Sequence, residues 1–192
     1  MARNLDTCQV NSRVCKVRAF KHCGPNPKPL TENEAIALAE IAKTLSANPI
    51  IIQIGAYIGA STIALLEIRQ DATIFSVDIK PSMQEIINVA EAGLDTNRVI
   101  RLLGDSGNIG KHFPYQCDLL FFDGDHREAG IRRDIETWLH TAKGSIAFHD
   151  YILDNPPARN QVAKVVDEMI NLPTRLQVER LKVFETLDCR KS

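Results

Sequence analysis

Hydrophobic residues along the chain follow two periods in turn, and this pattern predicts strands that alternate with helices. Residues 50–54 hold four isoleucines in five positions, which is typical of a strand buried on both faces. Helical spacing follows directly, with Ile63 and Leu66 on one side. The same change of period predicts strands at 50–54, 73–78, 98–103, 118–122, 145–148, 175–179 and 182–186. Helices are predicted from Thr31 to near Asn48, over 60–69, from Ser82, around 131–139 and around 162–170.

This order of elements predicts an α/β fold with a doubly wound, mostly parallel sheet of seven strands and helices on both faces. The last two strands are separated by too few residues for a crossover, so we expect a terminal antiparallel pair. Two capping boxes, Thr31–Glu34 and Ser82–Glu85, mark helix starts. Residues 1–30 end in a Pro-rich connector and are expected to form a basic N-terminal arm, with 31–192 as a single domain.

The first strand leads into a glycine turn that predicts a ligand site. Gly55 lets the backbone turn sharply off the strand, and Gly59 is expected to leave room for a ligand against the main chain. The start of the next helix offers free N–H groups to a polar ligand. An ordinary strand-to-helix turn in another α/β protein is the alternative.

The turn resembles motif I of the class I S-adenosylmethionine-dependent methyltransferases, in the form that reads acid-x-Gly-Ala-Tyr-x-Gly-x-Ser in catechol-type O-methyltransferases. The resemblance implies a Rossmann-like methyltransferase fold with S-adenosylmethionine as cofactor. Gln53 stands at the acidic position and is neutral, so we expect weaker cofactor binding than in acid-bearing relatives, and tighter binding after Gln53→Glu. The residues that match the motif, and that are expected with Gln53 to bind the cofactor, are Gly55, Ala56, Tyr57, Gly59 and Ser61.

Acidic residues follow the other strands at the edge where ligands bind in an open α/β sheet. Asp78 closes the second strand and is expected to accept hydrogen bonds from both hydroxyls of a ribose, as the matching residue does in nucleoside-binding folds. Asp105 and Ser106 are expected beside the adenine. A turn or helix-cap role is the alternative for all three.

Two further strand ends suggest chemistry. Asp123, His149 and Asp150 are predicted to hold a divalent metal, magnesium or manganese, that stabilises a deprotonated substrate hydroxyl. The resemblance implies the role of Asp123, which is also expected to contact the cofactor, while His149 replaces an acid and favours a transition metal. His126 stands where the catechol-type enzymes have a lysine, so it is predicted to be the general base of a catalytic pair with Asp123. Capping of helices by these acids, and of its own helix by His126, is the alternative.

Composition narrows the class of partner. The chain has 192 residues, 44% hydrophobic and 24% charged, which is typical of a soluble globular protein. With no apolar run of membrane-spanning length and no signal-peptide core, a cytoplasmic location without a membrane partner is expected. The net charge of −1 argues against a nucleic-acid partner. Residues 1–29 carry a local charge of +5, which we expect to be solvated or to pack on a second subunit of a homodimer; contact with RNA or an anionic substrate is the alternative.

Cysteine spacing argues against a structural zinc site. Cys8, Cys15 and Cys23 lie near His22, but they are six and seven residues apart, without a Cys-x-x-Cys pair. Free thiols in a reducing compartment are expected.

These observations together predict a S-adenosylmethionine-dependent methyltransferase that methylates an oxygen of a small molecule, with divalent-metal assistance. A non-catalytic S-adenosylmethionine-binding protein on the same scaffold is the alternative. A nicotinamide-dependent oxidoreductase is less favoured, because Gly-x-Gly-x-x-Gly is missing.

Overall fold

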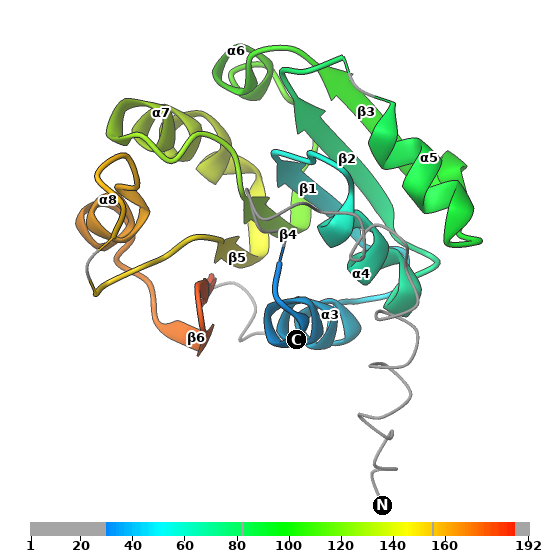
Figure 1. Cartoon of the computed structure of the whole chain (residues 1–192), viewed down its shortest axis with the longest axis horizontal. Helices are drawn as coiled ribbons and strands as arrows, with labels where there is room; N and C mark the ends of the chain where they lie inside the picture. The colour runs from blue at the N-terminus through cyan, green and yellow to red at the C-terminus, as the bar shows by residue number, and fades with distance from the viewer. Residues whose placement is uncertain (1–29, 82, 155, 187–192) are drawn as a thin grey trace, which may run out of the picture.

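The computed structural model describes residues 30–81, 83–154 and 156–186, which form a seven-stranded sheet between two layers of helices (Figure 1). The N-terminal arm and its cysteines therefore lie outside the described residues, apart from Leu30. The strands are β1 (Ile50–Ile54), β2 (Thr73–Asp78), β3 (Val99–Leu103), β4 (Cys117–Phe122), β5 (Ala142–Phe148), β6 (Thr174–Val178) and β7 (Leu181–Glu185). The helices are α3 (Glu32–Lys43), α4 (Ala60–Ile68), α5 (Gln84–Glu91), α6 (Ser106–Gly110), α7 (Glu128–Trp138) and α8 (Val162–Met169), with 3₁₀ turns at Thr96–Arg98 and Leu139–Thr141.

The sheet has the strand order β3-β2-β1-β4-β5-β7-β6. Strands β1 to β5 pair in parallel, and β7 is antiparallel to both β5 and β6. The doubly wound sheet and its terminal antiparallel pair are thus confirmed. The order reverses between β1 and β4, and this is the point where such sheets bind ligands.

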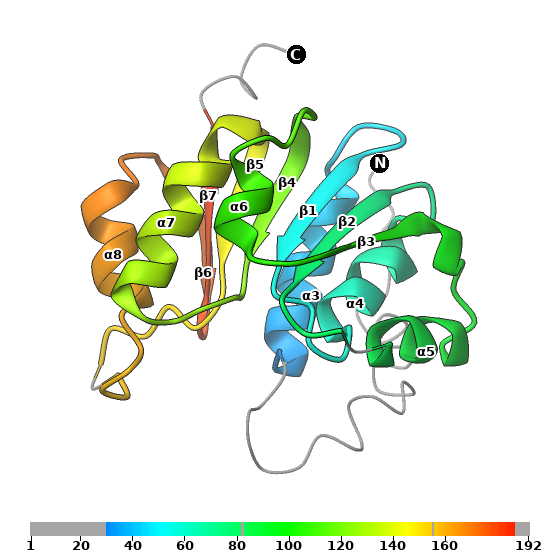
Figure 2. The same cartoon turned by 90° about the horizontal axis from the view of Figure 1, so that it is seen from above.

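The isoleucine run is explained by helices on both faces of β1. Ile51 packs in the core cluster under α3 and α4, whereas Ile52 and Ile54 pack in the cluster under α7 and α8. Figure 2 shows α3, α4 and α5 on one face of the sheet and α6, α7 and α8 on the other. Gln53 shares the face of Ile51, so its side chain points into the α4–α5 layer. None of the described helices is long and apolar enough to cross a membrane.

Strand bounds agree with the predictions within a residue or so, except at β5. That strand begins at Ala142, three residues earlier than predicted. The prediction began too late because Lys143 and Gly144 resemble a turn in the sequence. A Cβ on Gly144 would lie 2.1 Å from the carbonyl oxygen of Asp118, at a register shift between β4 and β5. Glycine is therefore used there for close strand approach.

The predicted capping box at Thr31–Glu34 forms. Thr31 accepts from the backbone N–H of Glu34 and donates its own N–H to the Glu34 carboxylate at 2.8 Å, which opens α3. The second predicted box begins at Ser82, which lies outside the described residues. Its Glu85 carboxylate accepts hydrogen bonds from Gln53 and Thr62 in the protein interior. Asp105 is the N-cap of α6, where its side chain accepts from the backbone N–H of Asn108.

Candidate active site

A cavity of about 830 Å³ opens beyond the carboxyl ends of β1, β2 and β4, where the strand order reverses. Its walls come from the turn after β1, the ends of β2 and β3, and the first turns of α7. Residues far apart in the sequence meet here because parallel strands end at one edge. The predicted cofactor residues that line it are Gly55, Tyr57, Asp78, Asp105, Ser106 and Asp123.

The glycine turn is held by Asp78. Gly55 adopts φ +87°, and a Cβ there would lie 2.1 Å from the carbonyl oxygen of Asp123, so only glycine fits. The N–H groups of Ala56 and Tyr57 donate to Asp78 Oδ2 at 3.2 and 3.0 Å, and Lys80 N–H donates to Oδ1 at 2.8 Å. Asp78 therefore shapes the turn as well as facing the cavity.

Gly59 faces helix α5 and not the cavity. Its φ is +83°, and a Cβ would lie 2.9 Å from Cγ of Glu85. The expectation that Gly59 leaves room for a ligand is corrected: α5 occupies that space. Ala56 is also buried and absent from the cavity wall.

Gln53 and Ser61 likewise turn away from the cavity, into a buried polar cluster with Thr62, Ser76 and Glu85. The Gln53 side chain is 0% exposed, and its amide donates to Thr62 Oγ1 at 2.6 Å, to Glu85 Oε1 at 3.0 Å and to Ser76 Oγ at 3.2 Å. Ser61 Oγ donates to Gln53 Oε1 at 3.0 Å. Thr62 and Ser76 both donate to Glu85, and Arg101 Nε lies 3.3 Å from its carboxylate. The acidic group near this turn therefore comes from α5.

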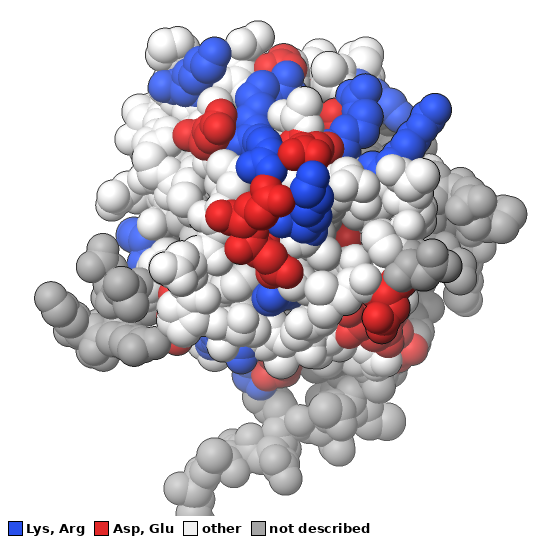
Figure 3. Space-filling model, turned by 90° about the vertical axis from the view of Figure 1, so that its left-hand side faces the viewer, with Lys and Arg blue, Asp and Glu red and all other residues white. Residues whose placement is uncertain are grey.

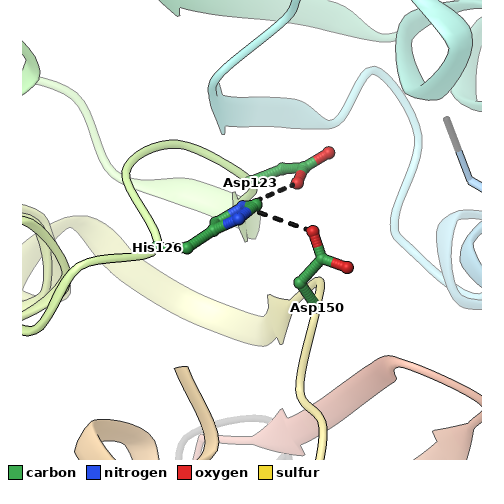
Figure 4. A group of neighbouring side chains, drawn as sticks. All are labelled: Asp123, His126 and Asp150. Carbon is green, nitrogen blue, oxygen red and sulfur yellow. Dashed lines mark ion pairs between the residues drawn. The ribbon is translucent and has the colours of Figure 1, made fainter. Parts of the chain in front are cut away.

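Asp123, His126 and Asp150 point toward one another at the ends of β4 and β5 (Figure 4). His126 Nε2 lies 3.7 Å from Asp123 Oδ1 and 3.4 Å from Asp150 Oδ2. This nitrogen is buried and makes no hydrogen bond to the described residues. Asp123 and the charge of Asp150 raise the pKa of His126, so the ring holds its proton above its ordinary range. The predicted base would therefore stay protonated to a higher pH than a free histidine.

His149 is enclosed by carboxylates on both sides. Nδ1 lies 3.0 Å from Asp123 Oδ1, and Nε2 lies 3.1 Å from Glu34 Oε2. Burial opposes ionisation, but Asp123 and Glu34 together raise the pKa of His149 to about 10. Both ring nitrogens are engaged by these carboxylates, so neither is free to face a metal. The predicted set of Asp123, His149 and Asp150 is corrected at His149, because the side chains whose possible ligand atoms converge are those of Asp123, His126 and Asp150.

The sequence reasoning missed Glu34 and Arg180 as members of this edge. Arg180 donates to Glu34 through its backbone and guanidinium, and to Asp150 Oδ1 at 2.7 Å. Burial disfavours the Glu34 carboxylate, but hydrogen bonds from His149 and Thr31 lower its pKa to about 2. Glu34 was visible in the sequence only as a capping-box residue.

A family model described as a methyltransferase domain matches residues 52–151, which run from within β1 to just beyond β5 and include the whole glycine turn. The chain belongs to this methyltransferase family. No curated protein matches the chain in sequence.

Solved methyltransferase structures share the fold of this family member. A protein from Klebsiella pneumoniae assigned as an O-methyltransferase superposes with a TM-score of 0.71 at 18% identity, over 92% of this chain and 89% of that one. The O-methyltransferase TomG from Streptomyces achromogenes, solved with S-adenosylmethionine, gives 0.65 at 16% identity over 93% and 90%. An rRNA methylase from Streptococcus thermophilus gives 0.61 at 13% identity over 83% and 99%. The Rossmann-like methyltransferase fold is thus confirmed.

Proposed function

We propose that this methyltransferase transfers the methyl group of S-adenosylmethionine to an oxygen of a small molecule. The observation that carries the proposal is the cavity beyond β1, β2 and β4, lined by Gly55, Asp78 and Asp123 in a chain of this family. In the reaction an acceptor hydroxyl would release its proton to solvent water, and the resulting oxygen anion would attack the sulfonium methyl. The carbon–sulfur bond breaks as the carbon–oxygen bond forms, and S-adenosylhomocysteine leaves.

The cofactor is proposed to lie along the cavity from Asp78 toward α6. Three backbone N–H groups already donate to the Asp78 carboxylate, which has about four acceptor positions. The remaining capacity faces the cavity and suits a ribose hydroxyl. Asp105 and Ser106 would then border the base, while Gln53, Gly59 and Ser61 support the turn from behind.

A divalent metal fits Asp123, His126 and Asp150. The separations of 3.4 and 3.7 Å are too long for hydrogen bonds, but they suit ligand atoms that share one ion at about 2.1 Å. A small cavity of about 20 Å³ adjoins Asp123 and His126, roughly the room of one water molecule. Imidazole favours manganese or another transition ion over magnesium. Such an ion would lower the pKa of an acceptor hydroxyl.

His126 cannot ligate an ion through Nε2 and take up a proton there at the same time. The metal role is preferred, because this buried nitrogen makes no hydrogen bond to the described residues and faces two carboxylates. Without an ion, His126 and Asp123 would be a proton-transfer pair.

A small acceptor is preferred to RNA because the charged side chains seen on one flank are mixed. Figure 3 shows the flank formed by α7 and α8, where basic and acidic groups alternate. Glu128 pairs with Arg132 and Lys164, and Arg132 also pairs with Glu168. Such pairing leaves little uncompensated positive charge for phosphates.

The test is methyl transfer from radiolabelled S-adenosylmethionine to a panel of phenols and alcohols, with ribosomal RNA as a separate acceptor. We expect transfer to a small acceptor, loss of activity with chelator and recovery with manganese. Asp150→Asn should lose activity and bound manganese together. Cofactor binding without transfer to any acceptor would favour the non-catalytic alternative. Full activity in metal-free protein would exclude the ion.

A further inference from the structure

Asp134 is a buried carboxylate on the cavity wall that the proposed reaction leaves without a role. It lies on α7, its residue is 3% exposed, and it still lines the cavity. Within the described part of the chain it forms no ion pair, and its recorded hydrogen bond comes from Ser106 Oγ to Oδ1 at 2.5 Å. Burial raises the pKa of Asp134 above the ordinary carboxyl range. A buried carboxylate with one donor has acceptor capacity that remains unfilled.

The position of this carboxylate is fixed by contacts between α6 and α7, which lie side by side (Figure 2). Trp138 Nε1 donates to the carbonyl oxygen of Ser106 at 3.0 Å, and Arg133 pairs with Asp105 at 3.2 Å. Oδ2 of Asp134 would be 3.4 Å from a Cβ on Gly124, which also lines the cavity. The second oxygen thus lies close to Gly124, and both residues belong to the cavity wall.

The direction of the proposed cofactor brings its base to this wall. Asp78 ends β2, whereas Ser106 follows β3 and Asp134 follows β4. One cavity is nevertheless lined by all three residues, so a nucleoside with its ribose at Asp78 can place its base between Ser106 and Asp134. Adenine carries an exocyclic amino group, which donates hydrogen bonds, whereas hypoxanthine carries an oxygen at that position.

We propose that Asp134 reads the exocyclic amino group of the adenine and makes the site selective for 6-amino over 6-oxo purines. The assignment rests on the proposed function. A 6-oxo base would set an acceptor against the carboxylate and leave both without a donor. Sites built to bond an N–H reject analogues that lack it, because the buried protein group is left unpaired.

Calorimetric titration with S-adenosylhomocysteine and its deaminated analogue S-inosylhomocysteine tests this. Wild type should bind S-adenosylhomocysteine about 10-fold or more tighter than S-inosylhomocysteine, because the deaminated ligand loses one buried hydrogen bond. In Asp134→Asn the amide can donate to the 6-oxo group, so the ratio should fall about 10-fold or invert. Glu136→Gln, on an exposed position of the same helix, should leave the ratio unchanged.

The outcomes separate the two proposals. If Asp134 only holds α6 against α7, Asp134→Asn should weaken the binding of both ligands equally. The ratio of the two affinities would then stay constant, which would overturn the assignment. A wild-type ratio near one overturns it without any variant, so a misfolded Asp134→Asn does not decide the matter. Failure of wild type to bind either ligand would contradict the proposed function itself, and this assignment with it.

Discussion

Replacing Gln53 by glutamate should destabilise the protein and not improve its cofactor binding. The resemblance to acid-bearing relatives predicts the opposite, but the Gln53 amide nitrogen lies 3.0 Å from Glu85 Oε1 in a fully buried cluster. The substitution would set two carboxylates against each other there. Two unit charges at that separation repel by about 5 kcal/mol at an effective dielectric constant of ~20.

The introduced carboxyl can avoid this repulsion only by keeping its proton. Its pKa in the folded protein is then raised above the unfolded value of about 4.3. A group with a raised folded pKa contributes its stability at low pH and loses it as pH rises. The deficit should therefore grow by about 1.4 kcal/mol per pH unit above pH 4.3, to a limit of about 5 kcal/mol.

Urea unfolding at pH 5 and pH 8 measures the deficit directly. We expect Gln53→Glu to lose about 1 kcal/mol at pH 5 and several kcal/mol more at pH 8. Gln177→Glu, on an exposed position of β6, should change the free energy of unfolding by less than about 0.5 kcal/mol at either pH. Equal stability of Gln53→Glu and wild type at pH 8, or tighter binding of S-adenosylhomocysteine, would refute the reasoning.

Three further predictions follow from single groups. Gly55→Ala should lower the free energy of unfolding by about 3 kcal/mol or more, because the added Cβ meets the Asp123 carbonyl. Gly93→Ala, at φ +75° with open space around it, should lower it by only about 1 kcal/mol, and equal losses in urea unfolding would contradict the clash. Burial raises the pKa of Cys117 to about 12, so iodoacetamide at pH 8 should label it only in denaturant, and fast labelling of folded protein on peptide mapping would show the burial to be wrong. Because the pKa of Glu34 is lowered to about 2, its ionised form contributes about 3 kcal/mol to the free energy of unfolding above pH 4.5, and this contribution is lost as pH falls toward 2. The difference in unfolding free energy between wild type and Glu34→Gln should therefore shrink over that pH range, and a constant difference would argue against it.

The sheet was predictable because its signal is local. Ile51 and Ile52 point to opposite faces and are both buried, so a continuous apolar run is enough to define β1 as a central strand. The turn after β1 was predictable for the same reason, because Gly55 directly follows β1 and Asp78 ends the next strand, β2. Gly144 shows the limit: it resembles a turn locally but lies within β5, where the main chain of β4 approaches closely.

The site could be predicted only in part because its electrostatics are not local. Gln53 meets Glu85, 32 residues away, and His149 meets Glu34, 115 residues away. Neither pairing has a signature in the sequence around either residue. His149 therefore looks like a metal ligand until Glu34 is seen on its far side. His126, three residues from Asp123, was within reach of spacing arguments but was assigned the base role.

The central claim is that the cavity beyond β1, β2 and β4 binds S-adenosylmethionine, and a crystal structure with S-adenosylhomocysteine tests it most directly. We expect ligand density along that cavity, with a ribose hydroxyl on the Asp78 carboxylate and the base between Ser106 and Asp134. Density for the ligand elsewhere on the protein, or a reversed ligand with the base at Asp123, would contradict it.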